Sequence, residues 1–69
     1  MKLIKLTNSN QTQGGEPLLI NADCIVSVVR GVATREDNVL ENVTYVFIPP
    51  HGTWEVRESL DEIMELVNG

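Results

Sequence analysis

The chain carries VTYVFIPPHGTWEVR at residues 43–57, and this stretch decides the fold. Its first six residues are all β-branched or aromatic, which are the residue types enriched in strands. Two adjacent prolines cannot continue a central ladder, and Gly52 permits the positive φ of a tight turn. Trp54 and Val56 then alternate with polar residues, as in a strand with one buried face. The stretch therefore predicts a β-hairpin with its turn at residues 49–52.

A helix is predicted over residues 59–68, directly after this hairpin. Ser59 and Glu62 form an S-x-x-E capping box, which satisfies two backbone N–H groups at a helix start. The apolar residues that follow recur at helical spacing and define one stripe: Leu60, Ile63, Met64 and Val67. A helix of about ten residues is too short to be stable in isolation. It must therefore dock on the sheet or on another subunit.

The N-terminal part of the chain reads as short strands separated by polar turns. Residues 2–7 are rich in strand-forming side chains and predict a first strand, whereas residues 8–16 contain no apolar residue and predict a loop. Pro17 lacks an N–H group and therefore fits the first residue of the next strand. Asn and Asp readily bond their own backbone, so residues 21–23 predict a bend or a single helical turn.

The central part predicts one further strand and a loop. Residues 24–30 form a near-continuous β-branched run, which we expect to be covered by the core on one face and by a second subunit on the other. Residues 34–38 form a polar tip, and the apolar pair at 39–40 either extends the following strand or closes the loop. The expected fold is α+β and mainly β: a single domain over residues 1–69 with a small antiparallel sheet of about four strands and one C-terminal amphipathic helix.

Length and charge favour self-association over most other functions. A chain of 69 residues has a thin core, and such domains are usually stabilised by a metal, by disulfides or by oligomerisation. One cysteine, Cys24, and one histidine, His51, provide neither a disulfide within the chain nor a four-ligand zinc site. The net charge is −5, and the five Lys and Arg residues are scattered, which disfavours binding to nucleic acid. We expect a homo-oligomer with no metal and no cofactor.

The sequence also gives an expectation about location. No apolar run of 18 residues is present to span a membrane, and Lys5 interrupts the apolar opening segment, unlike the long apolar region of a signal peptide. We therefore expect a cytoplasmic protein with a reduced thiol and no contact with the membrane.

Three segments together resemble a known family. They are Ile4–Thr7, Asn21–Ile25 and Val56–Ile63, and they match an I-x-L-T opening, an N-x-x-x-I segment and a closing V-x-E-S-x-x-E-I run. This order resembles the FlbD-type proteins, small chains encoded among bacterial flagellar genes. Residues 8–16 and 31–42 are longer here than the corresponding turns of that family. The resemblance implies a shared architecture, no enzyme activity and no cofactor.

Each conspicuous side chain has a plain structural explanation. His51 fits a surface turn, because no orienting partner for a general base stands near it in sequence. Cys24 lies among aliphatic residues and fits a packing role. No pocket for a small-molecule substrate is expected in so short a chain. The carboxylates around the helix are expected to form a solvated face: Glu55, Glu58, Asp61, Glu62 and Glu65.

The sequence thus predicts a protein that is not an enzyme and that acts as a self-associating interaction or structural module, with a partner protein as a further ligand. The alternative is a small regulator that binds nucleic acid or a basic nucleic-acid-binding partner. The interface candidates are the apolar residues of the strands, the hairpin and the helix stripe: Val26, Val28, Tyr45, Phe47, Trp54, Leu60, Ile63, Met64 and Val67.

Overall fold

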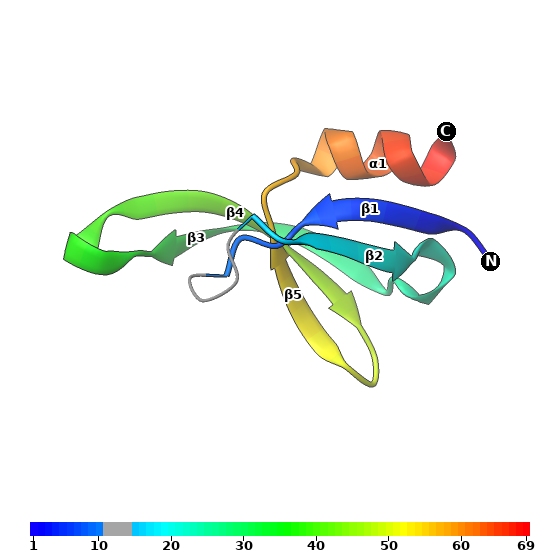
Figure 1. The fold of residues 1–69 in the computed structure, drawn as a ribbon, viewed down its shortest axis with the longest axis horizontal. Helices are drawn as coiled ribbons and strands as arrows, with labels where there is room; N and C mark the ends of the chain where they lie inside the picture. The colour runs from blue at the N-terminus through cyan, green and yellow to red at the C-terminus, as the bar shows by residue number, and fades with distance from the viewer. Residues whose placement is uncertain (11–14) are drawn as a thin grey trace.

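The computed structural model describes residues 1–10 and 15–69. The described chain is α+β and mainly β, as predicted, with the α-helix at its C-terminus (Figure 1). Its elements follow in the order β1 (Leu3–Thr7), β2 (Pro17–Asn21), the 3-10 helix η1 (Ala22–Cys24), β3 (Ser27–Thr34), the 3-10 helix η2 (Glu36–Asn38), β4 (Leu40–Ile48), β5 (Gly52–Val56) and α1 (Leu60–Asn68). Over these residues, no helix has the length and apolar character needed to cross a bilayer.

The strands form two antiparallel sheets, which corrects the prediction of one sheet of about four strands. β1 pairs with β2, placing Ile4 opposite Ile20, and a second sheet has the order β3-β4-β5 (Figure 1). The physical reason lies in η1, where the side chain of Asn21 accepts a hydrogen bond from the backbone N–H of Asp23. This turn redirects the chain after β2, so that β3 leaves the β1–β2 hairpin and pairs with β4 instead.

The two sheets are joined where β1 ends. Asn8 bridges Val56, the N–H of Ser9 donates to the carbonyl of Glu55 at 2.9 Å, and the N–H of Arg57 donates to the carbonyl of Thr7 at 3.0 Å. Asn8 and Ser9 are therefore buried, although both fall in the segment predicted as a polar loop. Residues 11–14 of that loop lie outside the described residues. The contact covers the C-terminal end of the second edge of β5.

Strand alternation builds the core between the two sheets. Each sheet turns one face inward, and α1 adds a single buried residue, Ile63. The buried apolar cluster consists of Ile4, Leu6, Ile20, Val46, Ile48, Val56 and Ile63.

The β3–β4 hairpin is longer than predicted and projects as an arm. β3 starts at Ser27, three residues after the expected start at Cys24, because the preceding Ile25 and Val26 belong to the irregular connection that follows η1. At the tip, Asp37 and Asn38 adopt φ values of 62° and 61°, a region that these side chains tolerate, and this shortens the turn. Both strands therefore extend outward, and the molecule measures 40 Å along its longest axis (Figure 1).

Candidate interaction surface

An apolar groove lies between α1 and the chain that runs from η1 into β3. Of the helix stripe, Ile63 is 3% exposed, whereas Leu60 and Met64 remain 37% and 59% exposed. The groove has a volume of about 440 Å³. Its lining, which defines the α1–β3 groove, consists of Ala22, Ile25, Val28, Leu60, Ile63, Met64, Val67 and Asn68. The helix therefore docks on the sheet, one of the two placements predicted for it, but it leaves part of its stripe uncovered.

Polar contacts fix the segment that leads into α1. The hydroxyl of the fully buried Thr44 donates to the carbonyl of Glu58 and accepts from Nη1 of Arg30 at 3.0 Å. The carboxylate of Glu58 in turn accepts from both the N–H and the hydroxyl of Thr7, each at 2.8 Å. The start of α1 is thereby attached to β1 and β4 at once, which sets the position of one wall of the groove.

Both ends of α1 are capped. The hydroxyl of Ser59 accepts from the N–H of Glu62 at 3.1 Å, and the carboxylate of Glu62 accepts from the N–H of Ser59 at 3.2 Å, so the predicted capping box is confirmed. At the other end, Nζ of Lys2 donates to the carbonyls of Val67 and Gly69 at 2.7 and 2.6 Å. A cation at the helix C-terminus is favourable because the carbonyls there carry partial negative charge. Lys2 therefore contributes to holding the helix beside β1.

The groove runs alongside an open sheet edge. Among the described residues, β3 is hydrogen-bonded on one side only, to β4. Val26, Val29 and Val32 are exposed by 65%, 52% and 57%, and Arg30 is the one charged residue of the strand. A long edge strand with exposed apolar side chains and no proline is suited to pairing with another chain.

The predicted interface residues divide between two faces of the β3-β4-β5 sheet. The groove face carries Val28, and Trp54 shares this face through its pairing with Val46 and packs against the core. The opposite face carries Tyr45 and Phe47, with Val29 beside Tyr45. The aromatic residues therefore do not form one cluster, because Trp54 lies on the other side of the sheet from the remaining two.

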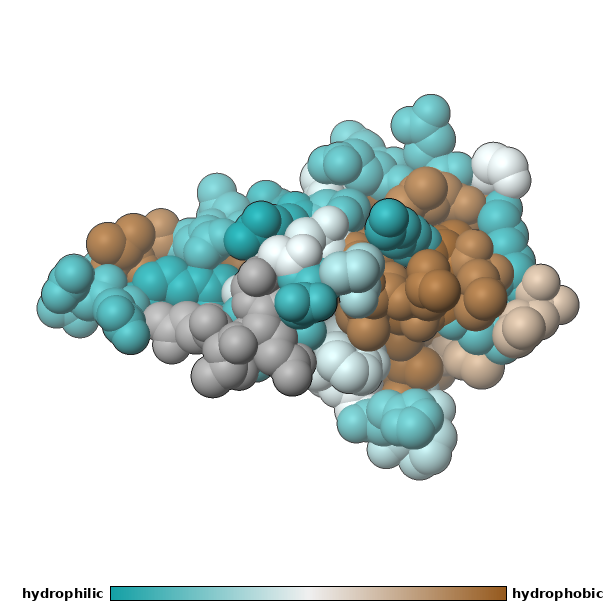
Figure 2. All heavy atoms as spheres, in the orientation of Figure 1, coloured by the Kyte–Doolittle hydropathy of each residue, from teal (hydrophilic) through white to brown (hydrophobic). Residues whose placement is uncertain are grey.

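A second apolar region is seen from the side of β1 and β2. Figure 2 shows hydrophobic residues gathered over the half of the molecule that holds α1, β1 and β2, with a smaller cluster near the end of the β3–β4 arm. Exposed apolar residues of these regions are Leu3, Leu19 and Leu66 in the first and Val32, Val39 and Leu40 in the second.

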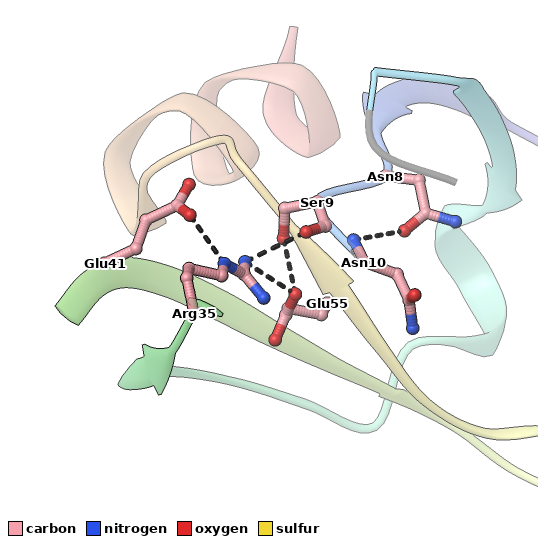
Figure 3. Close-up of polar contacts among 6 residues, drawn as sticks. All are labelled: Asn8, Ser9, Asn10, Arg35, Glu41 and Glu55. Carbon is pink, nitrogen blue, oxygen red and sulfur yellow. Dashed lines mark hydrogen bonds and ion pairs between the residues drawn. The ribbon is translucent and has the colours of Figure 1, made fainter. Parts of the chain in front are cut away.

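Arg35, which directly follows the last residue of β3, organises a polar cluster (Figure 3). Its Nε donates to Glu41 at 2.6 Å, and its Nη2 donates to the carboxylate of Glu55 and to the carbonyl of Ser9, both at 2.9 Å. Ser9 also donates its hydroxyl to Glu55 at 3.0 Å. The hydrogen bond from Arg35 holds the pKa of Glu41 below its usual value, and the two carboxylates raise the pKa of Arg35. The cluster ties the arm to β5 and to the end of β1.

This cluster corrects the interpretation of the acidic residues. Glu55 and Glu58 were expected on a solvated face together with the helix carboxylates, but both are half-buried and hydrogen-bonded. Sequence reasoning missed these contacts because Ser9, Arg35 and Glu55 are separated by 20 to 46 positions and share no periodic pattern.

His51 and Cys24 lie near each other at the surface. Both line a hollow of about 290 Å³, together with Trp54 and residues of β2. His51 is exposed in the turn before β5, as predicted. Cys24 is exposed as well, in contrast to the packing role expected for it, because no residue of η1 is buried. Within residues 1–10 and 15–69, no group of three His, Cys, Asp or Glu side chains is placed to hold a metal ion.

Comparisons with family models, with curated proteins and with solved structures found no match. The resemblance to FlbD-type proteins therefore stays a prediction.

Proposed function

We propose that this protein is a non-catalytic interaction module that self-associates through the α1–β3 groove. The observation that carries the proposal is the partial docking of α1, which buries Ile63 and leaves Leu60 and Met64 facing open space. Burying apolar surface yields about 25 cal/mol per Å², so an open groove of this kind is stabilised by an apolar partner.

The exposed surface of the chain supports the same proposal. A compact monomer of 7.7 kDa is expected to expose about 4300 Å². This chain exposes 4694 Å². A standard interface removes about 800 Å² from each partner, or about one sixth of this surface. The free chain therefore exposes more surface than a compact monomer of its mass. Burying part of this surface against a partner would raise the stability of its thin core.

Light scattering on a size-exclusion column tests the proposal, with two matched helix variants. Met64→Glu places a carboxylate in the groove, whereas Leu66→Glu adds the same side chain on a face of α1 that lines a separate hollow beside Lys5. Glu and the residues it replaces have similar helix propensities, so both helices should form. We expect the parent and Leu66→Glu to be dimers or larger and Met64→Glu to shift towards monomer. A parent that is monomeric at every concentration, or two variants that behave alike, would contradict the proposal.

A second candidate is a regulator that binds a basic partner or nucleic acid. It is favoured by the hollow beside Lys5 and Leu66, where Glu65 stands with Glu58 and Glu62, although the last two carboxylates already accept hydrogen bonds within the chain. Direct binding of nucleic acid is disfavoured because Lys2, Arg30 and Arg35 already bond to groups of this chain. A gel-shift titration at low salt separates the two, since retardation of nucleic acid by the pure protein would favour direct binding.

A further inference from the structure

We infer that β3 forms an antiparallel pair with β3 of a second copy of this chain, around a two-fold axis at Val29. This inference rests on the proposed self-association and specifies its geometry. The resulting dimer has one continuous six-stranded sheet.

Among the edge strands of the described sheets, β3 is the best suited to pairing with another chain. β1, β2 and β5 are each only five residues long, β2 starts with Pro17, and residues 7–9 cover the C-terminal end of the second edge of β5. β3 has eight residues, no proline and a single charge. Proteins commonly protect free edges with proline, with several charges or with very short strands. β3 has none of these devices, whereas β2 has two of them.

A second copy fits this edge because the strand is close to self-complementary. In an antiparallel pair, residues that oppose each other must lie on the same face of the sheet. A two-fold axis perpendicular to the sheet must therefore pass beside one residue, which then lies directly opposite its own copy. Near the middle of β3 that residue is Val29, Arg30 or Gly31. An axis at Arg30 would oppose two like charges, which is destabilising. An axis at Gly31 would have no side chain on it, whereas Val29 offers an exposed aliphatic contact.

The axis at Val29 also covers the groove. Val28 lines the groove and lies beside the axis, and Ile25 lines it three residues earlier. A two-fold axis perpendicular to the sheet keeps equivalent faces on the same side, so the grooves of both copies adjoin and their exposed Leu60 and Met64 side chains approach each other. On the opposite face, Val29 meets its own copy beside Tyr45, and Phe47, which is 40% exposed, lies opposite Ser27 on the same face. Apolar surface is therefore buried on both faces of the new sheet.

Cysteine cross-linking tests this geometry. In a Cys24→Ser background, single cysteines are placed at Ser27, Val29 and Thr34, with Leu19→Cys as a control outside β3. Opposed residues of a β-ladder lie about 5 Å apart, within disulfide range, whereas residues two positions from the axis are about 14 Å from their own copies. We expect Val29→Cys to form a disulfide-linked dimer under mild oxidation at a rate several-fold above the other three variants.

The outcomes separate this inference from the proposed function. Efficient cross-linking at Val29 alone supports the axis. A protein that is dimeric by light scattering but that does not cross-link at Val29, or that cross-links best at another position, overturns the pairing or its register and leaves self-association intact. A protein that is monomeric and does not cross-link overturns both.

Discussion

Replacing Thr44 by valine should destabilise the protein, because the buried hydroxyl has two partners and valine has none. The hydroxyl donates to the carbonyl of Glu58 and accepts from Arg30, and the residue is fully buried. Valine keeps the shape and removes the polar atom, so the Glu58 carbonyl loses its donor. An unsatisfied buried polar group costs about 1–3 kcal/mol, and the added apolar contact offsets only part of this. We expect a net loss of about 1–2 kcal/mol in the free energy of unfolding.

Thermal and urea unfolding measure this loss. At about 2.1 cal/mol/K per residue, 69 residues give an unfolding entropy near 145 cal/mol/K, so each kcal/mol lowers Tm by about 7 °C. The matched control is Thr53→Val, the same change at an exposed position of β5, where an effect within about 0.5 kcal/mol is expected. Protein concentration is held constant, because self-association would itself raise Tm. If Thr44→Val and Thr53→Val unfold at the same midpoint, the assigned role of the hydroxyl is wrong.

Three further changes have defined expectations. Gly31→Ala should lower stability by about 1–3 kcal/mol in urea unfolding, because its Cβ would overlap with Cε2 of Tyr45. The loss should largely disappear in a Tyr45→Leu background. Ser59→Ala removes the helix cap and should cost about 1 kcal/mol, with a weaker helical signal in circular dichroism; an unchanged signal would count against the cap. Arg35 lowers the pKa of Glu41 from its usual value of 4.5, so the folded state binds this proton less readily than the unfolded state. That stabilisation is complete above the unfolded pKa and is lost as the pH falls through the lower folded pKa. On acidification below about pH 5, Glu41→Gln should therefore lose less stability than the parent. Equal slopes of the free energy of unfolding against pH in the two proteins would contradict this.

Local signals in the sequence were sufficient for the hairpin and the helix. Two adjacent prolines, as before His51, cannot continue a central strand because they lack N–H groups. The capping box that starts at Ser59 is complete within four residues. The division into two sheets was not predicted, because a run of short strands does not show where one sheet ends, and the turn at η1 that sends β3 to β4 was expected only as a bend or a single helical turn. The start of β3 was misplaced since Ile25 has a strand propensity that the turn at η1 overrides.

The candidate site was predicted in outline only. The apolar stripe of α1 indicated a docked helix, and Leu60 and Met64 were among the expected interface residues. Which members of the stripe stay exposed depends on how the helix is held by Thr44 and Lys2, and neither contact has a signature in the sequence. The open edge of β3 was likewise not evident, because an edge position is a property of the assembled sheet.

The junction at Asn8 and Val56 also has a consequence for synthesis of the chain on the ribosome. The backbone of residues 7–9 finds its partners in residues 55–57, and Lys2 finds its acceptors at Val67 and Gly69. The nascent N-terminal hairpin therefore gains these partners only after residues 55–57 and 67–69 have been synthesised. Contacts so distant in sequence slow folding, since the closing loop must lose its entropy before those contacts form.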